Sequence, residues 1–116
     1  MATTVNHETL RRLAVEVGEE TVSSLLVVFS DELSRYYDQL AETPSTNQVR
    51  EISHAIKSSA ASFGADELAE LARECESRVK LGQESWVHEQ LPRLTSMLQG
   101  TASEYKALAD QENLFN

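Results

Sequence analysis

The sequence has little of what builds disulfides, tight loops and membrane spans. Its 116 residues include one cysteine, two prolines and four glycines. The lone Cys75 can form neither an internal disulfide nor a metal cluster by itself. So little proline and glycine indicates long helices joined by few turns. The longest apolar run, residues 25–29, is far shorter than the roughly 20 residues that cross a bilayer.

Basic residues are also scarce. Ten Lys and Arg stand against 19 Asp and Glu, which gives a net charge of −9. A surface of this charge repels phosphate backbones and anionic lipid, so we expect neither a nucleic-acid partner nor a membrane partner. Residues 1–8 contain no basic stretch followed by an apolar run, so no secretory signal is visible and we expect a cytoplasmic protein.

The apolar residues recur at the three- and four-residue spacing of helices, and no segment alternates as a half-buried strand does. The predicted stripes are Leu10, Leu13 and Val17; Val22, Leu25, Phe29, Leu33, Tyr36 or Tyr37, and Leu40; Val49, Ile52, Ile56, Ala60 and Phe63; Leu68, Leu71, Cys75 and Val79; and Val87, Leu91, Leu94, Leu98, Tyr105 and Leu108. The pattern predicts an all-α fold.

Short polar segments separate these stripes. Asn6 caps the first helix, which stops at Gly18, and residues 43–47 end the second, which begins near Glu19. The third helix ends at Gly64, the fourth spans residues 65–81, and the last begins near residue 84. We therefore expect one domain over residues 1–116, an up-down four-helix bundle with a short extra N-terminal helix. Residues 110–116 look like a frayed tail.

Three histidines are candidates for chemistry. His7 and His88 lie among polar neighbours and are expected to be solvated. His54 lies two residues from Ile52 and from Ile56, which turns it roughly 200° away from the core. It should project from the middle of a helix, beside Arg50, Glu51, Lys57, Ser58 and Ala61. The small residues from Ser58 to Ser62 either leave this face bare for a docking partner or let another helix pack closely.

Metal and nucleotide chemistry find little support. Residues 51–54 form a Glu-x-x-His element, but di-iron bundles need two copies, and the other close pair, Glu84 and His88, is four apart. The sequence contains no nucleophile elbow and no glycine-rich phosphate loop. We therefore expect no metal site, no cofactor and no recognisable ATP site.

Residues 54–68 resemble the signature of histidine-containing phosphotransfer (HPt) domains. That signature is a histidine followed by an apolar residue at two, lysine at three, a small residue at four, glycine at ten and leucine at fourteen. The residues at these positions are His54, Ile56, Lys57, Ser58, Gly64 and Leu68. Residues 51–66 and the chain length are most similar to the stand-alone LuxU-type HPt proteins of quorum-sensing phosphorelays.

The resemblance implies a role for four of the matched residues. His54 is the phosphoacceptor, and an unperturbed imidazole keeps one ring nitrogen free for attack near neutral pH. Lys57 offers an ammonium to phosphoryl oxygens, and Ser58 leaves room for the group. Gly64 ends the helix, and its tight turn lets the next helix come close.

Many HPt domains have Gln twenty-two residues after the histidine, where this sequence has Glu76. One interpretation is that the Glu76 carboxylate accepts a hydrogen bond from Nδ1–H of His54 and so fixes the tautomer with a free Nε2. The other is that Glu76 is a solvated acid near Arg73 and Lys80.

By resemblance, the protein is a monomeric phosphocarrier without an ATP or metal site of its own. His54 would take a phosphoryl group from the phosphoaspartate of a sensor-kinase receiver domain and pass it to the receiver of a response regulator, which brings the Mg²⁺. The expected docking face comprises Arg50, Glu51, Ala61, Ser62 and Ala65. The alternative is a helical adaptor that binds a protein through this face without being phosphorylated.

Overall fold

The computed structural model describes residues 5–111 and 115, and within this part of the chain it contains five helices and no strand. The helices are α1 (His7–Val17), α2 (Glu19–Ala41), α3 (Thr46–Ser62), α4 (Asp66–Lys80) and α5 (Glu84–Ala109). The all-α prediction is therefore confirmed, and each helix lies where the apolar spacing placed it. A frayed tail was predicted for residues 110–116. Of these, residues 112–114 and 116 lie outside the described part of the chain.

Local capping explains where several helices begin. The side chain of Asn6 accepts a hydrogen bond from the backbone N–H of Thr9 at 3.2 Å, and Ser45 does the same for Gln48 at 3.1 Å. These bonds satisfy donors that the first turn of a helix leaves unpaired. Gly18 separates α1 from α2 at a φ of 92°, a conformation that favours glycine.

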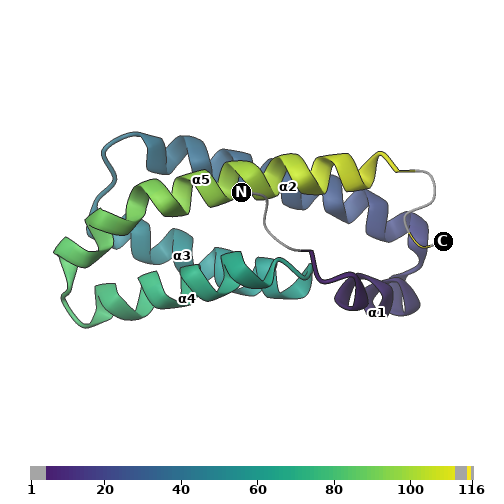
Figure 1. The fold of residues 1–116 in the computed structure, drawn as a ribbon, viewed down its shortest axis with the longest axis horizontal. Helices are drawn as coiled ribbons and strands as arrows, with labels where there is room; N and C mark the ends of the chain where they lie inside the picture. The colour runs from purple at the N-terminus through teal and green to yellow at the C-terminus, as the bar shows by residue number, and fades with distance from the viewer. Residues whose placement is uncertain (1–4, 112–114, 116) are drawn as a thin grey trace.

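The four long helices lie side by side along a molecule of 45 × 22 × 21 Å (Figure 1). The tightest partnerships are between α2 and α5 and between α3 and α4, while α4 also packs on α5. The short α1 packs on α2. In the view of Figure 1, α2 and α5 form the upper side and α3 and α4 the lower side. No helix in the described residues is long and apolar enough to cross a membrane.

The core is built from the predicted stripes with small shifts. In α2, Leu26 is fully buried and Leu25 is only half-buried, so the predicted stripe is wrong by one residue there. Some stripe ends also lie nearer the surface, since Phe63 and Val79 are half-buried and Val17 is exposed. Leu91, inside the stripe of α5, is half-buried as well. The remaining stripe residues of α3, α4 and α5 are buried together in one continuous core.

Three aromatic rings fix the end of α3 to α2 and α5. Phe29 stacks on Phe63 with ring centroids 4.7 Å apart, and Tyr105 meets Phe29 edge-on at 5.0 Å. The Tyr105 hydroxyl donates a hydrogen bond of 2.7 Å to the backbone carbonyl of Phe63, and burial raises the pKa of this phenol. This cluster holds α3 in place relative to the helices behind it.

Gly64 makes room for Asn6, a neighbour that its expected place at the end of the helix did not indicate. Its φ is 79°, and a Cβ added to it would lie 2.6 Å from the backbone oxygen of Asn6. The Asn6 N–H donates to the Gly64 carbonyl at 2.9 Å, and the Asn6 side chain donates to Asp66 at 3.0 Å. The turn between α3 and α4 thus holds Asn6, the residue that caps α1.

We predict that Gly64→Ala destabilises the protein more than Gly82→Ala does. Both glycines have positive φ, at 79° and 76°, so each alanine costs about 1–2 kcal/mol for the left-handed backbone. Only Gly64 has a backbone atom in the way, because nothing lies within 4 Å of a Cβ at Gly82. Overpacking therefore adds about 1–3 kcal/mol at Gly64. Urea unfolding of the two variants measures this difference, and equal losses would contradict the close approach to Asn6.

Candidate functional site

His54 lies halfway along α3 and points away from the core. Its side chain is 65% exposed, whereas Ile52 and Ile56, two residues to either side, are 5% and 0% exposed. This is the orientation that the spacing of the apolar residues predicts. The ring is held by a side chain of the neighbouring helix α4.

That side chain is Glu76. Its Oε2 atom lies 2.6 Å from Nδ1 of His54. An ionised carboxylate has no proton to donate, so Nδ1 carries the hydrogen and donates it. In the neutral ring this assignment leaves the lone pair on Nε2, the nitrogen turned away from Glu76. The geometry matches the carboxylate–histidine pairs that orient nucleophiles and metal ligands.

Two lysines hold the same carboxylate. Lys57 Nζ donates to Oε1 of Glu76 at 2.7 Å, and Lys80 Nζ lies 3.7 Å from Oε2. The hydrogen bond from Lys57 contributes most to lowering the pKa of Glu76 to about 2, and His54 and Lys80 lower it further against the opposing effect of burial. Glu76 is therefore ionised throughout the physiological range.

The interpretation of Glu76 as a solvated acid is wrong. The residue is only 4% exposed, and Arg73 pairs with Glu70 on the outer side of α4. Lys80 does lie near Glu76, as that interpretation supposed, but its ammonium approaches the oxygen that also binds His54. The four-residue spacing of Glu76 and Lys80 on one helix indicates this contact, but nothing in that spacing points to the histidine.

Lys57 lies differently from its expected position. The resemblance assigns its ammonium to phosphoryl oxygens, whereas here it binds Glu76 and its side chain is 34% exposed. Because a lysine side chain is flexible and carries several donors, the same ammonium can bind an anion beside His54 and keep its bond to Glu76.

Most of the residues expected to form a docking face are accessible. Ser58, Ala61 and Ser62 are exposed, so close helix packing does not explain these small residues, although it does explain the fully buried Ala60. Glu51 is exposed and Arg50 is half-buried, and both bind Asn47. Ala65 is wrong as a docking residue because it is completely buried.

The other histidines are not among the residues bound to His54 or Glu76. His7 and His88 are both exposed, as expected. Glu51 of the Glu-x-x-His element accepts a hydrogen bond from Asn47 at 3.2 Å and takes no part in the contacts of His54. Within the described residues, no group of three or more His, Cys, Asp or Glu side chains is arranged to hold a metal ion.

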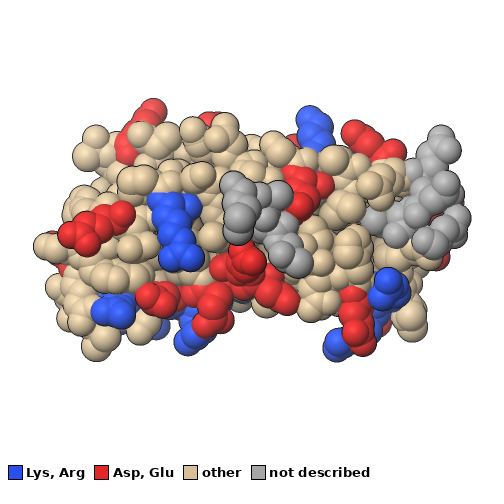
Figure 2. All heavy atoms as spheres, viewed as in Figure 1, with Lys and Arg blue, Asp and Glu red and all other residues tan. Residues whose placement is uncertain are grey.

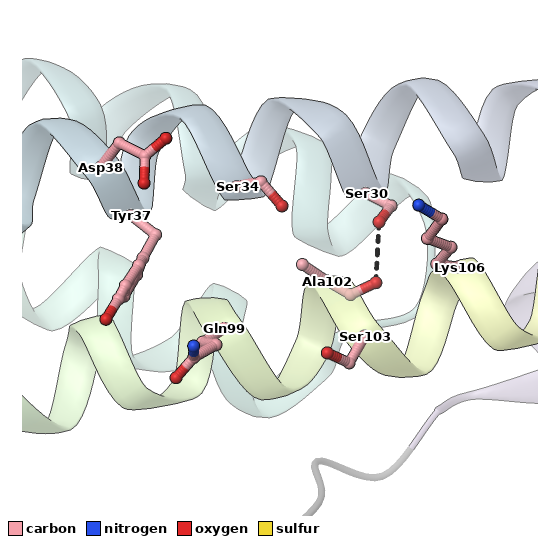
Figure 3. Close-up of a pocket in the computed structure, with 8 residues that line it drawn as sticks. All are labelled: Ser30, Ser34, Tyr37, Asp38, Gln99, Ala102, Ser103 and Lys106. Carbon is pink, nitrogen blue, oxygen red and sulfur yellow. Dashed lines mark hydrogen bonds between the residues drawn. The ribbon is translucent and has the colours of Figure 1, made fainter.

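Two further surface features lie outside this site. Acidic side chains gather over α4 in Figure 2, where Asp66, Glu67, Glu70 and Glu74 line a shallow hollow with Arg93. A second groove of about 290 Å³ runs between α2 and α5. Figure 3 shows its polar lining, with Asp38 and Lys106 well separated along it. None of the residues that contact His54 lines either feature.

The chain belongs to the Hpt domain family. Residues 24–104, most of the described bundle, match that family, and the match includes α3, α4 and the whole His54 cluster. The resemblance found in the sequence is therefore confirmed. No solved structure matches this chain.

Within the family, the chain is similar to several proteins named phosphorelay protein LuxU. It is 37% identical over 107 residues to that of Vibrio cholerae serotype O1, covering 90% of this chain and 95% of the relative. It is 40% identical over 82 residues to that of Vibrio harveyi, covering 68% and 72%. The Vibrio vulnificus protein is 40% identical over 81 residues, covering 67% and 70%.

We predict that the cluster around Glu76 makes folding stability fall in acid. A carboxyl whose pKa drops from 4.5 to about 2 on folding stabilises the protein fully above pH 4.5, and loses that contribution as pH falls toward 2. Urea unfolding at pH 5 and pH 3 should show a loss on the order of 2 kcal/mol from this group, and Glu76→Gln should remove that part of the loss. Glu74→Gln, which changes an exposed carboxyl on the same helix, is the matched control and should follow the unmodified chain.

Proposed function

We propose that this chain is a phosphorelay intermediate that carries the phosphoryl group on Nε2 of His54. The observation that supports this most directly is the combination of an exposed ring and a buried anion. Nδ1 is bound to Glu76 at 2.6 Å while the side chain remains 65% exposed. The ring is thereby oriented without being covered. Membership of the Hpt family and similarity to LuxU proteins support the same role.

The chemistry proposed at His54 depends on positioning and on charge. Nε2 attacks the phosphoaspartate of one receiver domain in line, and the receiver aspartate of a second partner later removes the group. Lys57, already beside the ring, neutralises the phosphoryl oxygens, and Ser58 leaves space one turn along α3. Gly64 supports the site indirectly by fixing the turn that joins α3 to α4.

In this proposal the protein is a carrier and not an enzyme. On this account it needs no ATP or metal site of its own, because the receiver domain supplies the Mg²⁺ that stabilises the transferring group. The partners are the receiver of a hybrid sensor kinase and the receiver of a response regulator, in quorum-sensing signalling of the LuxU type. The chain acts as a monomer in the cytoplasm, and its short connections favour an up-down arrangement of the four long helices.

The proposed docking face keeps Arg50, Glu51, Ala61 and Ser62 and loses Ala65. The exposed small side chains beyond His54 let a receiver approach α3 closely enough for its aspartate to reach Nε2. Figure 2 shows a group of acidic side chains over α4, so an approach along α3 avoids that part of the repulsion between the acidic chain and an acidic receiver pocket.

We predict that His54→Gln abolishes phosphorylation and leaves the fold intact, because the side chain is exposed and contributes little packing. The protein is incubated with a phosphorylated receiver domain and Mg²⁺, and acid-labile phosphate is measured on this chain. His88→Gln, at another exposed histidine, is the control and should be labelled normally. Label that persists in His54→Gln would contradict the assignment, and binding without any label in the unmodified chain would favour the adaptor function.

A second prediction concerns the docking face. Ala61→Arg places a long charged side chain two turns from His54, and it should lower the rate of phosphotransfer at least about tenfold, or about 1.4 kcal/mol. Ser103→Arg introduces the same side chain at an exposed position in the groove between α2 and α5, where we expect no effect (Figure 3). Phosphotransfer assays quenched at successive times compare the two variants. Equal rates would show that Ala61 does not belong to the docking face.

A further inference from the structure

The anion that holds His54 does more than orient the ring. We propose that Glu76 keeps the proton on Nδ1 of His54 after Nε2 is phosphorylated, so that the carrier stores its phosphoryl group on a cationic imidazole. The inference rests on the proposed function and adds the protonation state of the phosphorylated form. An amide at residue 76 is able to donate as well as accept, whereas an ionised carboxylate only accepts.

Geometry makes loss of that proton unfavourable. Without it, the Nδ1 lone pair would face the Oε2 atom of Glu76 at 2.6 Å, and no hydrogen would lie between the two acceptors. The carboxylate cannot take up the proton easily, since Lys57 at 2.7 Å and Lys80 at 3.7 Å both favour its ionised form. Water solvates the Glu76 carboxylate little, because its side chain is only 5% exposed.

The other charges near the ring do not reverse this effect. Lys57 on α3 and Lys80 on α4 are cations that oppose a proton on Nδ1, but both are bound to or near the carboxylate, and their side chains are 34% and 61% exposed to screening water. Arg50 and Glu51, one turn earlier on α3, are both bound to Asn47. The phosphoryl group itself adds negative charge at Nε2, which favours a cationic ring.

The retained proton determines how the group is transferred. On loading, the Nε2 lone pair forms the N–P bond, and the P–O bond to the donor aspartate breaks with its electron pair going to the aspartate oxygen. The ring still holds its Nδ1 proton and becomes cationic. On unloading, an acceptor carboxylate oxygen bonds to phosphorus, the N–P bond breaks, and its electron pair returns to Nε2 to restore the neutral ring. The leaving group is neutral imidazole, and neither step needs an acid or a base.

A deprotonated ring would behave differently. Its leaving group would be the imidazolate anion, a much stronger base and therefore a poor leaving group. Transfer from such a ring would weaken as pH rises and the Nδ1 proton is lost. Glu76 thus makes the outgoing reaction insensitive to pH over the range in which a free phosphoimidazole titrates.

A direct test reads the protonation of the phosphorylated chain. Phosphoramidate phosphorylates histidine without any receiver, so the full chain with ¹⁵N-labelled histidine is loaded with this reagent. The Nδ1 resonance of residue 54 is then followed by NMR from pH 6 to pH 9. We expect Nδ1 to remain protonated beyond pH 8. A resonance that shows deprotonation below pH 7 would overturn the proposal.

A kinetic test uses the loss of phosphate from the loaded chain at the same pH values. The unmodified chain should change less than about threefold between pH 6 and pH 8, whereas Glu76→Gln should slow by about tenfold per pH unit above the point where its ring titrates. Glu74→Gln, outside the cluster, should follow the unmodified chain. Circular dichroism establishes whether each variant is folded. If Glu76→Gln does not fold, the NMR titration of the unmodified chain alone decides whether Nδ1 keeps its proton.

The two levels of inference fail in different ways. No acid-labile phosphate on His54 from any donor would overturn the proposed function itself. Normal loading of His54, together with the same pH profile for the unmodified chain and Glu76→Gln, would overturn only the role of the carboxylate.

Discussion

The site depends on one buried carboxylate shared by three cationic or proton-bearing groups. Glu76 contacts the ring of His54 and the ammonium of Lys57 across the seam between α3 and α4, and Lys80 approaches it from its own helix. A buried carboxylate without partners would destabilise the fold. Here its charge is compensated on both oxygens, so the electrostatic cost of burial is offset by the contacts that position the histidine.

The rest of the fold holds α3 and α4 in a fixed position relative to each other. The tight packing of α3 on α4 sets the distance between residues 54 and 76, and the aromatic cluster of Phe29, Phe63 and Tyr105 fixes the end of α3 from behind. The hydrogen bond from Tyr105 to the Phe63 carbonyl ties α5 to the same point. A histidine on a stiff, well-anchored helix is presented in one place, which suits a reaction that requires an in-line approach.

Periodicity alone was sufficient to predict the all-α fold and the outward direction of His54. Because Ile52 and Ile56, two residues to either side, face the core, a helix must turn His54 toward the opposite face. It was not sufficient for Leu25, since Leu25 and Leu26 are adjacent and equally apolar, and only the packing of the folded bundle selects Leu26 for the core. The resemblance pointed to Glu76, but not to its burial. Ala65 was misjudged because the sequence does not show that its side chain is buried at the turn between α3 and α4. Nor does it indicate that Asn6 returns to Gly64 in the same turn.

That return of Asn6 has a practical consequence for tagged versions of the protein. Because the backbone of Asn6 is bonded to the carbonyl of Gly64, a group fused directly to Asn6 starts two residues beyond Ser62 of the proposed docking face. A bulky reporter at that point would crowd the surface on which we propose that partners dock. A reporter placed directly after Ala109 starts from the end of α5 instead, so it is the better choice for assays in living cells.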